Sequence, residues 1–200
     1  MTVKEIHVDR NQLGATAKEL GSGGYGTVYA HSKKTLCLKE TVFPMPNELN
    51  ALMRLKGKKL KNVVTIHDVV YKANKGVCRH ESQSRLYVVM ERLRHPKPMH
   101  VRWFVELQTA TKCDIWAARS SMTLLNKDVA SYIRKCSGAK KKFCQALVNG
   151  AKELHKHGIV HEDVHDENFM ITKDGVPKFV DFGIVKLRAR HKIKKPKTVK

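Results

Sequence analysis

The stretch HEDVH contains residues that could do chemistry, and it fits more than one pattern. His161, Glu162 and His165 match H-E-x-x-H, in which two histidines on one helical face bind zinc and the glutamate activates a water molecule. Asp163 and Asn168, the latter three residues beyond the stretch, belong to a second pattern that overlaps the first. The surrounding sequence has to decide between the two.

A zinc site of this type requires a continuous helix, so that imidazoles one turn apart face one metal, and it requires a third ligand. The sequence Gly-Ile-Val at 158–160 is poor helix-forming material immediately before the motif, and no glutamate follows Glu167. In the extended form of the motif, Asn168 and Ile171 occupy the positions of a glycine and a histidine. The sequence therefore does not favour a metalloprotease.

A glycine-rich segment near the N-terminus supplies a second, independent motif. LGSGGYGTVY fits G-x-G-x-x-G-x-V at residues 21–28, where glycines let backbone N–H groups approach phosphate groups. A dinucleotide-binding fingerprint would require a helix to follow, whereas TVYAHSKKTLCLKE predicts a hairpin. Lys39 follows eleven residues after Val28, and its spacing of two from Cys37 predicts that both side chains lie on one face of a strand.

Together with YVVMERL, LHKHGIVHED, DENFMI and FVDFG, these motifs resemble the eukaryotic-type protein kinases over residues 15–185. The combination is far more specific than any one motif alone. The resemblance implies an α+β, protein-kinase-like fold, with a five-stranded β-rich N-lobe and one helix at 15–93 and a truncated, mainly helical C-lobe at 94–185. Residues 1–14 would form an N-terminal extension, and residues 186–200 a basic, disordered tail.

The resemblance also implies ATP and Mg²⁺ as cofactors and a role for each matched residue. Asp163 would accept the proton of the substrate hydroxyl, and Asn168 and Asp181 would bind Mg²⁺. Lys39 would bind the phosphates and pair with Glu48. Met90 would be the gatekeeper of the adenine site, with Glu91 and Leu93 in the hinge and Met170 beneath the base. The residues expected to bind or enclose ATP are Leu20, Gly21, Ser22, Gly23, Gly24, Tyr25, Gly26, Thr27, Val28, Cys37, Lys39, Glu48, Met90, Glu91, Leu93 and Met170.

Three departures from the family pattern bear on activity. Glu162 replaces the usual arginine before the catalytic aspartate, so no cation is expected there to bind a phosphorylated activation loop. His165 replaces the usual lysine; we count it as catalytic because it can still reach a phosphate, with a charge that depends on pH. The seventeen residues after Gly183 contain no A-P-E motif. We therefore expect a truncated kinase, which resembles those encoded by large DNA viruses or delivered by pathogens.

The elements that must position these residues are readable for most of the chain. Alternating or apolar runs predict strands, a helix is expected to begin at Pro46 and end before Gly57, and apolar residues at helical spacing predict a long helix ended by Gly158. Residues 94–125 are expected to be irregular or partly helical. Leu52, Ile66, His161 and Phe182 would stack as the family's hydrophobic spine. The predicted strands are 17–21, 26–31, 35–42, 63–71 and 85–92, the helices 46–56 and 139–157, and a hairpin 169–172 with 178–180.

The charge predicts polyanionic partners. The chain has 39 basic and 18 acidic residues, a net charge of +21, and such a balance favours nucleic acid or acidic protein as a partner. Much of the excess lies at 54–61, at 134–142 and in the acid-free segment 186–200. We expect an acidic or nucleic-acid-associated protein substrate, and a tail that targets the nucleus or binds nucleic acid.

Cysteine usage and hydropathy predict an intracellular protein. The five cysteines are odd in number, widely spaced and never arranged as C-x-x-C, which indicates neither a disulfide framework nor a cysteine zinc site. No signal peptide or membrane-spanning run is apparent, so no membrane partner is expected. We expect the cytoplasm or nucleus, that of a host cell if the protein is viral.

Two functions remain open from the sequence. As an enzyme, the protein would transfer the γ-phosphate of Mg-ATP to serine or threonine of a protein. As a non-catalytic mimic, it would bind nucleotide or a host kinase and act as a competitor. All four residues with direct chemical roles, Lys39, Asp163, Asn168 and Asp181, are present, which favours the enzyme.

Overall fold

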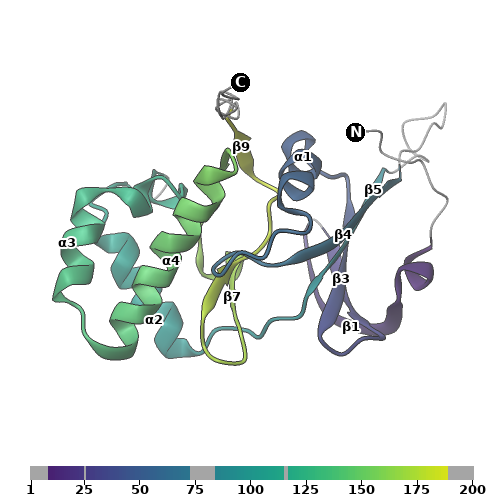
Figure 1. Ribbon diagram of the computed structural model, residues 1–200, viewed down its shortest axis with the longest axis horizontal. Coiled ribbons are helices and arrows are strands. Elements are labelled where there is room, and N and C mark those ends of the chain that lie inside the picture. Colours follow the sequence, from purple (N-terminus) through teal and green to yellow (C-terminus); the bar gives the residue numbers. More distant parts are fainter. Residues whose placement is uncertain (1–8, 25, 73–83, 115–116, 189–200) are drawn as a thin grey trace, which may run out of the picture.

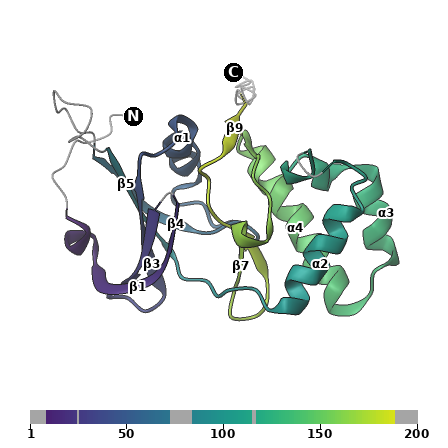
Figure 2. The same cartoon turned by 180° about the vertical axis from the view of Figure 1, so that it is seen from behind.

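The structure is a computed structural model that describes residues 9–24, 26–72, 84–114 and 117–188. Within these residues, a five-stranded sheet and one helix form one lobe, and three helices form most of the other (Figures 1 and 2). Two short pairs of strands complete the fold. This arrangement confirms the predicted α+β fold class.

The sheet of the first lobe is antiparallel and has the strand order β1-β2-β3-β5-β4. The β2–β3 hairpin pairs Val28 with Lys39, and β3 pairs with β5 so that Cys37 lies opposite Met90. Side chains two residues apart in a strand share a face, so Cys37 and Lys39 lie together as predicted. The strands are β1 (Ala15–Gly23), β2 (Gly26–His31), β3 (Leu36–Val42), β4 (Ile66–Lys72) and β5 (Arg85–Glu91).

Helix α1 (Pro46–Leu55) confirms the helix expected there. It begins with a proline, whose fixed φ suits the first helical position and which has no N–H to leave unpaired. One face is buried against the sheet. The side-chain amide of Asn47 donates to the carbonyl of Val185, 3.1 Å away, which connects α1 to the C-terminal part of the described chain. The buried residues of α1 are Glu48, Ala51, Leu52 and Leu55.

Three helices build the second lobe: α2 (Pro98–Thr109), α3 (Lys127–Lys135) and α4 (Gly138–Lys156). Helix α2 lies in the region expected to be irregular or partly helical, and it buries Phe104 and Leu107, three residues apart on one face. Single 3-10 turns occupy 117–119 and 123–125. Among the described residues, no helix is long and apolar enough to cross a lipid bilayer.

The long helix α4 confirms the predicted amphipathic helix and packs closely on the rest of the fold. A Cβ on Gly150 would lie 2.7 Å from the carbonyl oxygen of Asn62 and 2.8 Å from the ring of Phe179, so only glycine fits this approach. The carboxylate of Glu153 accepts the backbone N–H groups of Lys61 and Asn62, at 3.2 and 2.9 Å. These contacts fix α4 against the segment that leads to β4.

The two short strand pairs follow α4 in the chain. Strand β7 (Phe169–Ile171) pairs with β8 (Pro177–Phe179), the hairpin that the sequence predicted to within one residue at its ends. Strand β6 (Ile159–His161) pairs with β9 (Val185–Leu187). The tail expected from residue 186 therefore begins inside a strand, because Val185 is buried and the N–H of Arg188 bonds to the carbonyl of Gly158. Residues 189–200 lie outside the described residues.

A buried ion pair joins β5 to β8 and so connects the two lobes. The ammonium group of Lys178 lies 2.5 Å from Oε1 of Glu91, and the same oxygen accepts the backbone N–H of Thr65 at 2.7 Å. The side chain of Lys178 is 10% exposed and that of Glu91 is 24% exposed, so water can replace little of this contact.

Replacing Lys178 with methionine should destabilise the fold, because the carboxylate of Glu91 would stay largely buried without its cation. We expect the free energy of unfolding in urea to fall by about 1–3 kcal/mol. Lys173→Met, at an exposed position in the turn of the same hairpin, is the matched control. Equal unfolding midpoints for the two variants would contradict this account.

Candidate active site

A cavity of about 550 Å³ lies between the lobes and brings the predicted site residues together. Its walls come from the β1–β2 turn, β3, α1, the β5–α2 connection and the segments around Asp163 and Asp181. The predicted residues that line it are Leu20, Gly21, Ser22, Gly23, Gly24, Gly26, Val28, Cys37, Lys39, Glu48, Met90, Glu91, Leu93, Asp163, His165, Asn168, Met170 and Asp181.

Two predicted residues fall outside this set. Tyr25 lies outside the described residues. Thr27 is not among the described residues that line the cavity, and its hydroxyl lies 3.1 Å from that of Ser22, across the β1–β2 hairpin. This contact supports the glycine-rich turn rather than the cavity wall.

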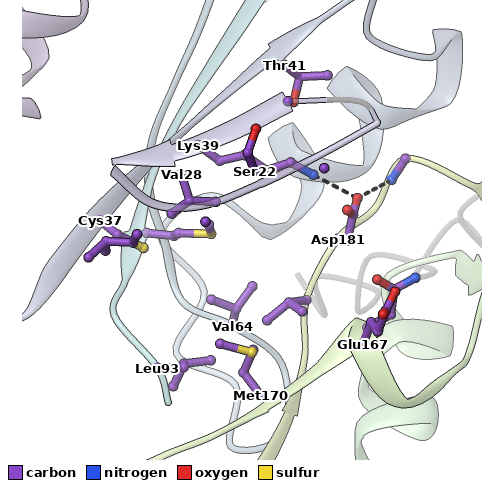
Figure 3. A pocket seen from close by; sticks show the side chains of 18 of the residues that line it. Ser22, Val28, Cys37, Lys39, Thr41, Val64, Leu93, Glu167, Met170 and Asp181 are labelled. Atoms are coloured by element: carbon purple, nitrogen blue, oxygen red, sulfur yellow. Dashed lines mark hydrogen bonds and ion pairs between the residues drawn. The ribbon is translucent and has the colours of Figure 1, made fainter. Parts of the chain in front are cut away.

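One end of the cavity is apolar. Figure 3 shows Val28, Cys37, Val64, Leu93 and Met170 gathered there, from β2, β3, the segment before β4, the β5–α2 connection and β7. Burial raises the pKa of the Cys37 thiol to about 11, and the nearby carboxylate of Glu91 adds to the rise against the opposing charge of Arg92. Cys37 is therefore a neutral, space-filling side chain in this wall.

The side chain and the backbone of Glu91, which the sequence predicted to lie in the hinge, have different partners. Its carboxylate binds Lys178, as described above, and its backbone N–H donates to the carbonyl of Thr65 at 3.0 Å. Its carbonyl oxygen lies 3.7 Å from Sγ of Cys37. The contact of the hinge backbone with adenine stays a prediction.

The other end of the cavity is charged. The ammonium group of Lys39 lies 2.8 Å from Oδ1 of Asp181, a contact that Figure 3 marks. It also lies 4.0 Å from Oε1 of Glu48, so β3, α1 and the segment after β8 meet at one cation. Burial alone would raise the pKa of Asp181, but the charge and hydrogen bond of Lys39 and the N–H of Gly183 together lower it. Burial raises the pKa of Glu48, which Lys39 only partly offsets. Lys39 therefore interacts more closely with Asp181 than with the expected partner.

The backbone at Asp181 is in the left-handed region, with φ of 53°. Such a conformation is costly for a residue with a side chain and persists where surrounding contacts require it. Here Oδ1 of Asp181 accepts the N–H of Gly183 at 3.1 Å as well as the Lys39 contact. These contacts direct the carboxylate into the cavity.

Asp163 has polar neighbours on both carboxylate oxygens. The side-chain N–H₂ group of Asn168 donates to its Oδ2 at 3.1 Å and to its backbone carbonyl at 2.9 Å. Nε2 of His165 also lies 3.3 Å from Oδ2, whereas Oδ1 receives the guanidinium group of Arg119 at 3.3 Å. Asp163, His165 and Asn168 therefore form one cluster, as predicted, and Arg119 is an addition to it.

His161 lies beneath this cluster and is fully buried. The N–H of Asp163 donates to its Nδ1 at 3.2 Å, so Nε2 carries the proton and donates to the carbonyl of Val180 at 3.1 Å. Burial lowers the pKa of this imidazole, which keeps it neutral. Its ring also packs 5.7 Å from that of Phe182, and Leu52 and Ile66 belong to the same core as Phe182, consistent with the predicted spine.

The zinc interpretation fails in the structure. His161 lies in strand β6, and a 3-10 turn begins only at Asp166, after His165, so no continuous helix joins the two histidines. Both ring nitrogens of His161 already have partners. Within the described part of the chain, no group of three or more His, Cys, Asp or Glu side chains could hold a metal ion.

Sequence reasoning missed several residues that line the cavity. Thr41 could have been found, because it lies two residues beyond Lys39 on the same face of β3. Val64 precedes β4 and is positioned by the tertiary fold, so no local pattern in the sequence indicates it. Other missed residues include Phe43, Met45, Glu167 and Ile184.

Comparison with known proteins identifies the family. A model described as the protein kinase domain matches residues 15–199. The chain therefore belongs to the protein kinase family.

Three relatives show how this chain compares with longer kinases. Serine/threonine-protein kinase STK11 of Homo sapiens is 27% identical over 180 residues, which are 82% of this chain and 33% of that protein. Serine/threonine-protein kinase PTK2 of Candida glabrata is 41% identical over 70 residues, 32% of this chain and 9% of that protein. Nik-related protein kinase of Mus musculus is 27% identical over 106 residues, 52% and 7% respectively. The chain spans a third or less of the length of these relatives.

Iodoacetamide at pH 8 should distinguish the cysteine in the cavity wall from an exposed one. The Cys37 thiol is buried and, with a pKa of about 11, remains protonated at this pH, whereas Cys113 is exposed. Because the thiolate is the reactive form, we expect Cys113 to be alkylated at least about tenfold faster, measured by peptide mass spectrometry after timed quenching. Unfolding in urea should remove the difference, and equal rates in the folded protein would contradict the assignment.

Proposed function

We propose that this chain is an ATP-dependent protein kinase that transfers the γ-phosphate of Mg-ATP to serine or threonine hydroxyls of a protein substrate. The main support is the convergence of Lys39, Asp163, Asn168 and Asp181 at one end of a cavity of about 550 Å³ whose other end is apolar. An apolar end suits a purine base, and a charged end suits phosphates. Relatives named as serine/threonine-protein kinases support this choice of acceptor.

The donor set fits Mg²⁺. Asn168 and Asp181 both offer oxygen atoms, the ligands that this cation prefers. The N–H₂ group of Asn168 is engaged with Asp163, which leaves its amide oxygen to bind a cation. When bound, Mg²⁺ would supply positive charge that neutralises the phosphates.

Asp163 would act as the base in the transfer. The hydroxyl oxygen of the substrate would bond to the γ-phosphorus while its proton moves to the carboxylate of Asp163 and the bond from phosphorus to the ADP oxygen breaks. Asn168 would hold Oδ2 of this carboxylate in place, and Lys39 would bind the phosphates between the lobes. Catalysis of this kind depends on positioning and charge, which the described contacts supply.

We also propose how the enzyme is controlled and what it acts on. Glu162 is exposed and acidic, so it would repel rather than bind a phosphorylated residue in the segment after Asp181. Activity would therefore not need such a phosphorylation. The net charge of +21 suits an acidic or nucleic-acid-associated substrate. The basic residues at 186–200 would bind nucleic acid or direct the protein to the nucleus.

Phosphotransfer from γ-labelled Mg-ATP to the protein itself and to mixed acidic and basic proteins tests the proposal. Asp163→Asn removes the base and Lys39→Met removes the phosphate-binding cation, so each should lower the transfer rate at least about 100-fold. Lys33→Met, at an exposed position in the β2–β3 turn, should retain the rate of the unmodified protein.

Two outcomes would count against the proposal. Equal transfer by all four proteins would show that the signal comes from elsewhere. If none transfers phosphate while Mg-ATP still raises the melting temperature, the chain is a nucleotide-binding mimic rather than an enzyme.

A further inference from the structure

The catalytic loop is supported by a segment that no motif marks. The N–H of Val164 donates to the carbonyl of Arg119 at 2.6 Å, and the N–H of Ser121 donates to the carbonyl of His161 at 2.7 Å. In return, the N–H of His161 donates to the hydroxyl of Ser121 at 3.0 Å. These bonds lie on both sides of Asp163 in the sequence, so residues 119–121 are fixed alongside the loop that holds it.

Several contacts hold this supporting segment in place. Ser121 is fully buried, and Leu124, in the next 3-10 turn, is part of the hydrophobic core. Asn126 then begins α3, where its side chain accepts the N–H of Val129 at 2.9 Å. The side chain of Gln108, from α2, donates to the carbonyl of Val164 at 2.8 Å, so the loop is also bound from a second helix. Arg119 therefore projects from a well-supported backbone.

The guanidinium group of Arg119 completes the coordination of the Asp163 carboxylate. Nη1 lies 3.3 Å from Oδ1, whereas Asn168 and His165 contact only Oδ2. The two oxygens are thus held from different parts of the chain. Arg119 is 44 residues from Asp163 in the sequence, whereas His165 and Asn168 are at most five residues away. A carboxylate held at both oxygens has one orientation rather than several.

Arg119 also changes the charge beside the base. The loop at residues 161–168 contains no lysine or arginine, whereas Glu162, Asp166 and Glu167 are acidic. An arginine stays protonated throughout the working range of proteins. The side chain of Arg119 is 42% exposed, so this constant positive charge lies where Asp163 meets solvent.

We propose that Arg119 is a positioning residue for phosphoryl transfer, which holds Oδ1 of Asp163 and supplies the fixed positive charge that the catalytic loop lacks. The inference rests on the proposed function. It does not extend to nucleotide binding, because Arg119 is not among the described residues that line the cavity. Arg119 would therefore affect the transfer step, through the position of Asp163 relative to the acceptor hydroxyl.

Arg119→Ala should lower kcat by about 10–100-fold and leave the KM for ATP unchanged, since misplacing a reacting group by about 1 Å can cost about 100-fold in rate. Arg119→Lys keeps the charge and should recover part of the loss. Both variants retain the backbone carbonyl that bonds to Val164, so the melting temperature should stay close to that of the unmodified protein. Arg134→Ala, an exposed arginine of α3, is the matched control and should retain full activity.

A double-mutant comparison separates positioning from structural support. If Arg119 acts through Asp163, Arg119→Ala should add no further loss to Asp163→Asn. Equal kcat for Arg119→Ala and the unmodified protein would overturn the inference while leaving the kinase proposal intact. A raised KM for ATP would also overturn it. So would a double variant whose loss in kcat is the product of the losses of the two single variants. An inactive unmodified protein would overturn both proposals.

Discussion

The Lys39–Asp181 contact is the interaction on which the rest of the site depends. It joins the sheet of one lobe to the segment after β8, at 2.8 Å, and the buried Glu48 of α1 lies 4.0 Å from the same cation. Without the cation, two carboxylates would face each other in a confined space, where like charges are costly. The pKa of Glu48 is raised, mainly by burial, whereas the pKa of Asp181 is lowered against burial by its closer contact with Lys39 and its bond from Gly183.

The second constraint is the hydrogen bonding that holds the loop around Asp163 in place. A neutral, buried His161 accepts one hydrogen bond and donates another, which fixes the backbone at Asp163 relative to Val180 and so to Asp181. Residues 119–121 hold the other side of the loop. The carboxylates of Asp163 and Asp181 are thus placed by one hydrogen-bonded unit, although Asp163 follows β6 and Asp181 follows β8.

The sequence predicted the parts of the site that are encoded locally. The glycine-rich turn, the strand that contains Lys39 and the loop from His161 to Asn168 are short patterns whose spacing alone determines which side chains share a face or a turn. The fold class followed from the resemblance to protein kinases that these motifs carry together. Strand β9 was missed because the basic composition from residue 186 obscured the alternating apolar pair at 185 and 187.

Two unpredicted contacts join segments that are distant in the sequence. Arg119 contacts Asp163, 44 residues away in the sequence, and Lys178 contacts Glu91, 87 residues away. Neither Arg119 nor Lys178 lies in a motif that would indicate its partner. Such pairs depend on how helices and strands pack in the folded protein. The spacing of residues within one segment does not predict that packing.

The most direct test of the central claim is the affinity for ATP, measured by titration calorimetry with and without Mg²⁺. If Asp181 and Asn168 place a cation beside phosphates, Mg²⁺ should tighten ATP binding to the unmodified protein on the order of tenfold and have little effect on Asp181→Asn. The same Mg²⁺ effect in both proteins, or no ATP binding by the unmodified protein, would contradict the account.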